Sequence, residues 1–405
     1  MVTKVLHTPY EKKDVHNALS MPVYDNVAFE FDTAEAMEKA FCGKSADHTY
    51  SRITNPTVQY FEKRVRTMTG AASVTALSSG MAAISNTLLN IAYQGSNIVT
   101  SAHLFGNTYS FLTNTLGKLG VETRFCNLSD PDEVRRAVDG KTCCIFLEII
   151  TNPQQEVADL KTLSAIGEAQ GVPLIADTTI VPFTAFCAAD FGVHLDLISS
   201  TKYISGGATS LGGLIIDYGN FSWKQSPVLA SQIKTAGEKN AFTARLRTEV
   251  HRNIGAYMTP HAAYMQSLGL ETLDLRFRQQ ATTCLHLAQR LRTLHGITAV
   301  NYTGLEDNPY HALSLAQFGA LPGAMLTLDL PSREHCFAFM NRLRLIRRAT
   351  NLFDHKTLAI HPASTIFGTF SDEQRQSMDV SQQTIRLSVG LETVDALFED
   401  ISQAL

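Results

Sequence analysis

Short apolar runs alternate with longer amphipathic stretches between about residues 65 and 217. The runs have the length of β-strands, and the stretches between them have the apolar spacing of helices. This alternation predicts an α/β fold, a mostly parallel seven-stranded sheet with helices on both faces. The predicted strands are Ser73–Leu77, Asn97–Ser101, Glu122–Cys126, Cys143–Glu148, Pro173–Ala176, Leu195–Ser199 and Gly213–Asp217. The helices predicted between them are Met81–Tyr93, Tyr109–Leu119, Pro131–Val138 and Asp159–Gln170.

The pattern changes after the last of these strands. A long helical region is predicted at about Asn240–Gly269 and Thr272–His295, with an interruption at Met258-Thr259-Pro260. Beyond it, three strands and two helices predict a smaller C-terminal α/β domain, made of Gly323–Leu330, Thr357–His361, Thr384–Gly390, Arg333–Arg344 and Val394–Leu405. We therefore expect a large domain at residues 58–255 and a C-terminal domain at residues 256–405. The segment at residues 1–57 has little regular pattern and is too long for an ordinary tail. We expect this arm to pack on a neighbouring subunit.

Composition and charge exclude several classes of protein. With 44% hydrophobic and 18% charged residues, the chain fits a well-buried globular core rather than disorder. A net charge of −4 provides no basic surface for nucleic acid. No apolar run approaches the roughly 20 residues that span a bilayer, and the first residues lack an apolar signal segment, so we expect a cytoplasmic protein without membrane contact. The seven cysteines and thirteen histidines show no metal-ligand spacing, so we expect free thiols and no metal.

The segment Ser199–Gly207 carries the most informative chemical signal in the chain. It reads Ser-Ser-Thr-Lys-Tyr-Ile-Ser-Gly-Gly and follows the apolar run Leu195–Ile198. A lysine framed by hydroxyls and followed by glycines, directly after a buried strand, suits the covalent attachment of pyridoxal 5′-phosphate (PLP). Ser199 and Thr201 stand at alternating positions, so both hydroxyls are predicted to face a phosphate. The same residues also fit a strand-to-loop turn with a solvated Lys202.

Two other predicted strands end in residues that suit PLP. Ser78-Ser79-Gly80-Met81 is a small-residue turn opening a helix, and its free backbone N–H groups could hold a phosphate. An ordinary helix N-cap is the other interpretation. Asp177 ends an apolar strand, where its carboxylate could pair with the pyridine nitrogen. In isolation, Asp177 fits a cap of the following segment about as well.

Asn152 and Arg386 complete the candidate residues. Asn152 follows the strand Cys143–Glu148, where its amide could hydrogen-bond the ring oxygen of PLP, although Asn-Pro alone is only a turn signal. Arg386 is a single charge within the apolar strand Thr384–Gly390. A charge in that place needs a partner, and a substrate carboxylate bound by two hydrogen bonds is a good one. An internal salt bridge is the alternative.

The order of five motifs resembles the Cys/Met-metabolism PLP enzymes, the cystathionine γ-synthase-like group of fold-type I. The motifs are Tyr50–Thr57, Ser78–Met81, Ser199–Lys202, His361–Ser364 and Arg386–Gly390. The resemblance covers the chain from about Met21 to Leu405. It implies a fold-type I PLP-dependent transferase in which two chains share active sites. A tetramer built from such dimers is expected.

The resemblance also implies a role for each matching residue. Lys202 would bind PLP covalently and then move protons between substrate carbons, while Asp177 would pair with the pyridine nitrogen and Asn152 with the ring oxygen. Arg386, aided by Asn351, would hold the substrate α-carboxylate. The phosphate would be bound by Ser79, Gly80, Met81, Ser199 and Thr201, with Thr179 also in the cofactor site. From the neighbouring subunit, the phosphate would be reached by Tyr50 and Arg52.

Details of the sequence are similar to the O-acetylhomoserine sulfhydrylases rather than the γ-lyases of this group. The segment Ala208–Trp223 resembles the sulfhydrylase pattern, whereas γ-lyases usually carry Asp at the position of Thr209 and Cys at that of Asn107. The expected reaction is homocysteine formation from O-acetyl-L-homoserine and sulfide. The alternatives are a methionine or homocysteine γ-lyase, a cystathionine γ-synthase, and a PLP-binding regulator without enzymatic activity.

Four residues depart from the family pattern. Phe105 replaces a tyrosine that stacks on PLP, and it can stack in the same way but has no proton to exchange. Acetate leaves readily without protonation, so Phe105 favours an acylated substrate. Gly207 and Phe367 stand where relatives often have histidine, and Phe353 stands where they have glycine. We expect these changes to reshape the mouth of the site, which could then admit a sulfide-carrier protein bearing a thiocarboxylate.

Overall fold

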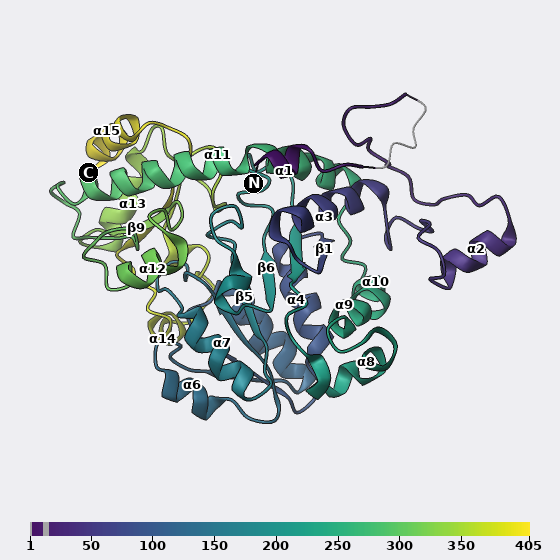
Figure 1. The fold of residues 1–405 in the computed structure, drawn as a ribbon. Helices are drawn as coiled ribbons and strands as arrows, with labels where there is room; N and C mark the ends of the chain where they lie inside the picture. Colours follow the sequence, from purple (N-terminus) through teal and green to yellow (C-terminus); the bar gives the residue numbers. More distant parts are fainter. Residues whose placement is uncertain (1, 11–15) are drawn as a thin grey trace.

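A seven-stranded sheet forms the centre of the chain in the computed structural model, which describes residues 2–10 and 16–405 (Figure 1). Its strand order is β1-β7-β6-β5-β4-β2-β3, and only β7 runs antiparallel to its neighbours. This confirms the mostly parallel sheet predicted from the apolar runs. The strands are β1 Ser73–Leu77, β2 Asn97–Thr100, β3 Glu122–Phe125, β4 Thr142–Glu148, β5 Leu174–Asp177, β6 Leu195–Ile198 and β7 Gly213–Asp217.

Helices cover both faces of this sheet, because its central strands bury side chains on both sides. In β4, Cys144 and Phe146 pack into the core beneath α4, whereas Ile145 and Leu147 pack into the larger core on the other face. Such a two-residue alternation is the geometry of a strand. The helices of this part are α3 Pro56–Thr69, α4 Gly80–Ile91, α5 Gly106–Ser110, α6 Pro131–Ala137, α7 Leu160–Ala169, α8 Ala230–Ala236, α9 Ala241–Arg245 and α10 His251–Ile254. Two π-helical stretches, Phe111–Leu116 and Leu246–Val250, follow α5 and α9.

Helix α11, Pro260–Leu291, is continuous, which corrects the predicted break between Gly269 and Thr272. Glycine is a poor helix former, so Gly269 would be expected to weaken the helix. Here the glycine serves close packing, since a Cβ on Gly269 would lie only 1.8 Å from the carbonyl oxygen of Ile204. The helix therefore presses its backbone against the loop that follows Lys202. It also spans the molecule, contacting α3 at one end and β8, β9 and α15 at the other (Figure 1).

A second sheet of five strands lies beside the large one, in the order β10-β11-β12-β9-β8. It contains the three predicted strands and two that the sequence pattern did not indicate, β8 and β10, which are short edge strands. The strands are β8 Ala299–Asn301, β9 Met325–Asp329, β10 Arg347–Arg348, β11 Leu358–Ile360 and β12 Thr384–Ser388. Its helices are α12 His311–Phe318, α13 Arg333–Arg342, α14 Asp372–Ser377 and α15 Val394–Ala404.

The N-terminal segment begins against its own chain. Helix α1, Val2–Leu6, packs on α3 and α11, and its Val5 is fully buried. Helix α2, Ala34–Phe41, instead lies out to the side of the body (Figure 1). The expected packing of the arm on a second subunit stays a prediction, and its residues 1 and 11–15 lie outside the described part. Within the described residues, no helix is both long and apolar enough to cross a membrane.

Candidate active site

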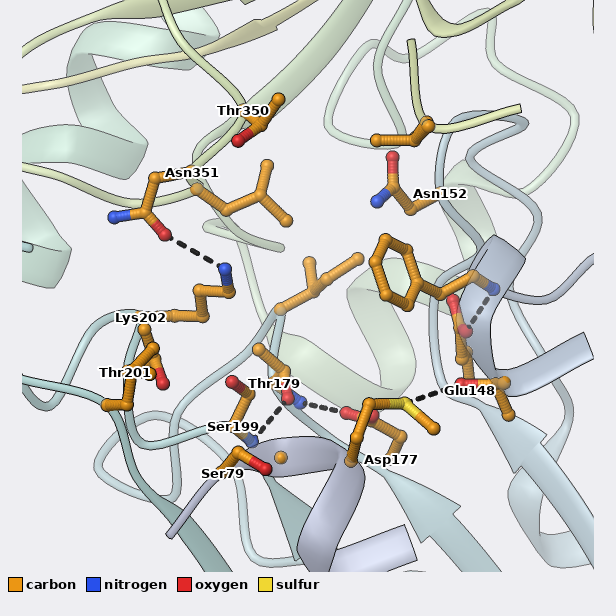
Figure 2. A pocket seen from close by; sticks show the side chains of 18 of the residues that line it. Ser79, Glu148, Asn152, Asp177, Thr179, Ser199, Thr201, Lys202, Thr350 and Asn351 are labelled. Carbon is orange, nitrogen blue, oxygen red and sulfur yellow. Dashed lines mark hydrogen bonds between the residues drawn. The ribbon is translucent and has the colours of Figure 1, made fainter. Parts of the chain in front are cut away.

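The candidate site is a cavity of about 670 Å³ where the carboxyl ends of β1, β4, β5 and β6 meet the second sheet (Figure 2). This is the edge at which open α/β sheets bind ligands. Twelve of the fourteen residues predicted from the sequence line it: Ser79, Gly80, Met81, Phe105, Asn152, Asp177, Thr179, Ser199, Thr201, Lys202, Asn351 and Arg386.

Lys202 enters this cavity from the turn after β6. Its Nζ donates a hydrogen bond of 2.9 Å to Oδ1 of Asn351, which comes from the other side of the cavity (Figure 2). The pKa of the Lys202 amine is lowered to about 8, chiefly by burial and also by the nearby charge of Arg386, while Asp177 opposes the fall. An amine with this pKa is substantially neutral near pH 8, so it can act as a nucleophile or a base.

The N-terminus of α4 faces the same cavity and approaches the lysine segment closely. A Cβ on Gly80 would lie 2.6 Å from Cβ of Ser199, so only glycine fits there. Ser79 caps the helix by accepting a hydrogen bond from the amide of Ala82. The Ser199 hydroxyl has no partner among the described residues, whereas the Thr201 hydroxyl is held by the backbone of Gly212 at 3.0 and 3.2 Å. Of the two flanking hydroxyls, Ser199 is thus the one free to bind a ligand.

Asp177 lies at the end of β5, at the floor of the cavity. Its Oδ1 accepts a hydrogen bond of 2.9 Å from the amide of Thr179, and the Thr179 hydroxyl accepts one from the amide of Ser199. Burial raises the pKa of the Asp177 carboxyl, although Thr179 and Lys202 oppose the rise. A bound cation beside Asp177 would reverse that rise.

Glu148 is a site residue to which the sequence assigned no role. It stands opposite Asp177 in the register of β4 and β5, and its Oε1 accepts a hydrogen bond of 2.6 Å from the amide of Phe105. Burial, together with Asp177, raises the pKa of Glu148 to about 8. The available signal was a lone acidic residue ending a seven-residue strand that is otherwise almost apolar.

Arg386 is fully buried in β12 and has no acidic partner among the described residues. It donates long hydrogen bonds to neutral oxygens only: Asn152 Oδ1 at 3.3 Å, and the carbonyls of Thr350 at 3.3 Å and Asn351 at 3.2 Å. Its Nε is unpaired, and burial lowers the pKa of the guanidinium to about 9. The internal salt bridge considered as the alternative is therefore absent, and the charge is available to a ligand.

Three of the four unusual residues do not shape the cavity directly, contrary to expectation. Phe367 is fully buried in a small separate core, and its neighbour Ile366 lines the cavity instead. Phe353 is likewise fully buried, and Gly207 lies against the ring of His355. Only Phe105 lines the site, where it precedes α5.

Tyr50 and Arg52 do not line the cavity of their own chain. Arg52 stacks over the Tyr50 ring at 5.4 Å and donates a hydrogen bond to the carbonyl of Arg252, and Tyr50 is 39% exposed. Their predicted place at a neighbouring subunit's cofactor remains a prediction.

Comparison with known proteins assigns the chain to a family. The model of the Cys/Met metabolism PLP-dependent enzymes matches residues 2–405. An O-acetyl-L-homoserine sulfhydrylase of Thermus thermophilus is 34% identical over all of this chain and 99% of its own length. A solved O-acetylhomoserine sulfhydrylase from the methionine biosynthetic pathway of Wolinella succinogenes is 42% identical, with a TM-score of 0.78 over 88% of this chain and 99% of its own.

A putative O-acetylhomoserine (thiol)-lyase of Campylobacter jejuni, solved with N′-pyridoxyl-lysine-5′-monophosphate, has 30% identity and a TM-score of 0.92. The superposition covers all of this chain and 99% of that one. The full-length family match and the shared fold agree with the lysine, carboxylate and helix N-terminus that meet in the cavity. This chain belongs to the Cys/Met metabolism PLP-dependent enzyme family.

Proposed function

We propose that this protein makes L-homocysteine and acetate from O-acetyl-L-homoserine and sulfide, as a γ-replacement enzyme of methionine biosynthesis. The bond from the γ-carbon to the acetyl oxygen breaks, acetate leaves with the electron pair, and the sulfur forms the new bond to that carbon. The main support is that two basic side chains face one cavity. Lys202 has a lowered pKa, and Arg386 has no acidic partner among the described residues.

The residues of the cavity fit PLP. Lys202 offers the amine for covalent attachment, and Asp177 offers a carboxylate for the pyridine nitrogen. The free N–H groups at the start of α4 and the unpartnered Ser199 hydroxyl offer donors for the phosphate. When bound, PLP supplies a conjugated ring that stores the electron pair released as the substrate loses a proton.

Lys202 Nζ is placed to move the substrate's protons. Its lowered pKa leaves much of the amine neutral near pH 8, so it can take a proton from the α-carbon and later exchange one at the β-carbon. The Asn351 amide oxygen, 2.9 Å away, holds the amine in place. Phe105 offers no proton to the leaving group, which suits acetate because acetate departs without protonation.

The cavity also favours an acetyl over a succinyl group. The substrate α-carboxylate is proposed to bind Arg386, whose charge is uncompensated. Lys202 and Arg386 are the only cationic side chains among the described lining residues. Because Lys202 is proposed to attach PLP and Arg386 to bind the α-carboxylate, a second carboxylate would have no cation of this chain to pair with. A buried unpaired carboxylate costs several kcal/mol.

The proposed working form is a cytoplasmic tetramer built from dimers that share active sites. The shared sites are supported by the Tyr50–Arg52 pair, which lies outside the cavity of its own chain. The cytoplasmic location is supported by the seven free cysteines, because a reducing compartment keeps thiols unpaired. A mixture of Arg52→Ala and Lys202→Ala chains would test the sharing. Each variant alone is inactive under this proposal, and hybrids restore partial activity because one of their sites has both residues. Inactive hybrids would show that sites are not shared.

The sulfur donor is proposed to be sulfide or a sulfide-carrier protein. Product analysis of the PLP-loaded enzyme tests the reaction, with O-acetyl-L-homoserine alone, with sulfide, and with O-succinyl-L-homoserine in a parallel series. Homocysteine formed only with sulfide, and much faster from the acetyl ester, is expected. Abundant 2-oxobutyrate without sulfide would identify a γ-lyase and overturn the proposal.

A further inference from the structure

Phe353 is a buried aromatic residue with an unusual, left-handed backbone conformation. Its φ is +55°, in the left-handed region where a residue with a bulky side chain is strained, and its side chain is fully buried. Glycine would adopt this conformation without strain. Strain of this kind persists only where the surrounding contacts hold the residue in place, so the contacts of Phe353 indicate what it does.

The ring of Phe353 is held against the residue that follows Lys202. It stacks on the Tyr203 ring with a centroid distance of 4.0 Å and an angle of 5° between the planes. Tyr203 is itself fixed: its hydroxyl accepts a hydrogen bond of 2.9 Å from the amide of Ala324, and its carbonyl accepts one of 2.7 Å from Arg276. The stack therefore ties Phe353 to a rigid part of the lysine segment.

The backbone of Phe353 is held against the strand that carries Arg386. Its amide donates a hydrogen bond of 2.6 Å to the hydroxyl of Ser388, two residues beyond Arg386 on β12. Residues two apart on a strand point to the same face, so Ser388 and Arg386 face the same loop. In that loop, the carbonyls of Thr350 and Asn351 accept hydrogen bonds from Arg386, while the Asn351 side chain accepts one from Lys202.

Phe353 thus stands at the junction of the two groups that must hold one substrate molecule. We propose that Phe353 is a positioning residue that sets the distance between Lys202 and Arg386, and so determines how well an α-amino acid fits between them. The roles of Lys202 and Arg386 rest on the proposed function. The stack itself is a property of the chain without PLP, and it can be tested separately.

The test compares Phe353→Leu and Phe353→Gly with Phe339→Leu, a control that removes a buried ring from α13 in the same part of the chain. In the PLP-loaded enzymes, we expect both Phe353 variants to raise KM for O-acetyl-L-homoserine at least tenfold, with a smaller change in kcat. Phe339→Leu should lower the melting temperature without raising KM. Phe353→Gly relieves the backbone strain, so it keeps the test informative if the leucine variant folds poorly.

A second measurement uses the enzyme before PLP is added. The rate at which it captures PLP should rise with pH as Lys202 loses its proton, and the charged groups that shift this titration are Arg386 and Asp177. Loss of the stack on Tyr203 should loosen the segment that buries Lys202 and so reduce its desolvation. The midpoint should therefore move up by about one pH unit in both Phe353 variants. Tyr203→Leu should move it similarly, and the double variant with Phe353→Leu should add little.

Unchanged KM and an unchanged midpoint, with a loss of stability like that of Phe339→Leu, would show that Phe353 only fills the core and would overturn the proposal. Failure of the wild-type enzyme to convert O-acetyl-L-homoserine would count against the proposed function. The midpoint of PLP capture would still decide whether Phe353 positions Lys202.

Discussion

Replacement of Arg386 by methionine should reduce substrate binding without reducing the stability of the fold. These two effects usually go together when a buried residue is removed, so their separation is informative. Arg386 makes only long hydrogen bonds to neutral oxygens, and its Nε has no partner in the described structure. A pKa near 9 in place of 12.5 means that the site disfavours the guanidinium charge by on the order of 5 kcal/mol.

A substrate carboxylate would compensate that charge, whereas methionine would remove the need for compensation. Loss of the paired carboxylate should cost about 2–4 kcal/mol, which corresponds to a fall in kcat/KM of roughly 30- to 900-fold. The melting temperature should stay the same or rise, because replacing an uncompensated buried charge by an apolar side chain of similar length is neutral or stabilising.

The assay is kcat/KM for O-acetyl-L-homoserine, with thermal unfolding measured on the same samples. The analogue 3-aminopropyl acetate, which lacks the α-carboxylate, serves as a control, because the wild type and the variant should handle it equally poorly. An unchanged KM would place the carboxylate elsewhere. A large fall in melting temperature, with loss of PLP, would show that Arg386 holds the fold rather than the substrate.

Three further predictions concern the lysine segment and the region around it. Lys202→Ala should abolish both turnover and the visible absorbance of bound PLP, and retained turnover would remove Lys202 from its proposed role. Gly269→Ala should destabilise the protein by about 3 kcal/mol or more, because the new Cβ would overlap the carbonyl of Ile204; an unchanged melting temperature would show that α11 can shift freely. The pKa of His103 is raised, chiefly by its hydrogen bond to Glu156, so this pair should stabilise the fold below pH 6.5 and lose its effect as pH rises through the raised value. The difference in melting temperature between wild type and His103→Gln should therefore shrink from pH 6 to pH 9, and a constant difference would contradict the assignment.

The large sheet could be predicted from sequence because its central strands are apolar on both faces. The short edge strands of the second sheet could not, since both residues of Arg347–Arg348 are exposed and leave no pattern of buried positions. Gly269 was misread for a different reason. A glycine that lets two backbones approach and a glycine that ends a helix look the same until the partner of the close approach, here Ile204, is known.

The candidate site was predictable where one residue type has a specific chemical use, as with Lys202, Asp177 and Arg386. No role could be predicted for Glu148, because its partner, the amide of Phe105, lies 43 positions away in the sequence, in the loop after a different strand. Phe367 was expected near the mouth because it stands where relatives often have histidine. In the structure, Ile366 lines the cavity whereas Phe367 is buried in the small core beside it, which a sequence motif does not record.

The position of β12 has a consequence for the order in which the two halves of the site form during synthesis. This strand is the last in the chain, yet it lies in the middle of its sheet, between β9 and β11, and carries Arg386. The residues proposed to hold the cofactor all lie before position 203, most of them at the ends of strands of the large sheet. A chain emerging from the ribosome can therefore complete its proposed cofactor half first, while the half proposed to recognise the amino acid must wait for β12. The proposed amino-acid site is thus complete only after β12 has inserted between β9 and β11.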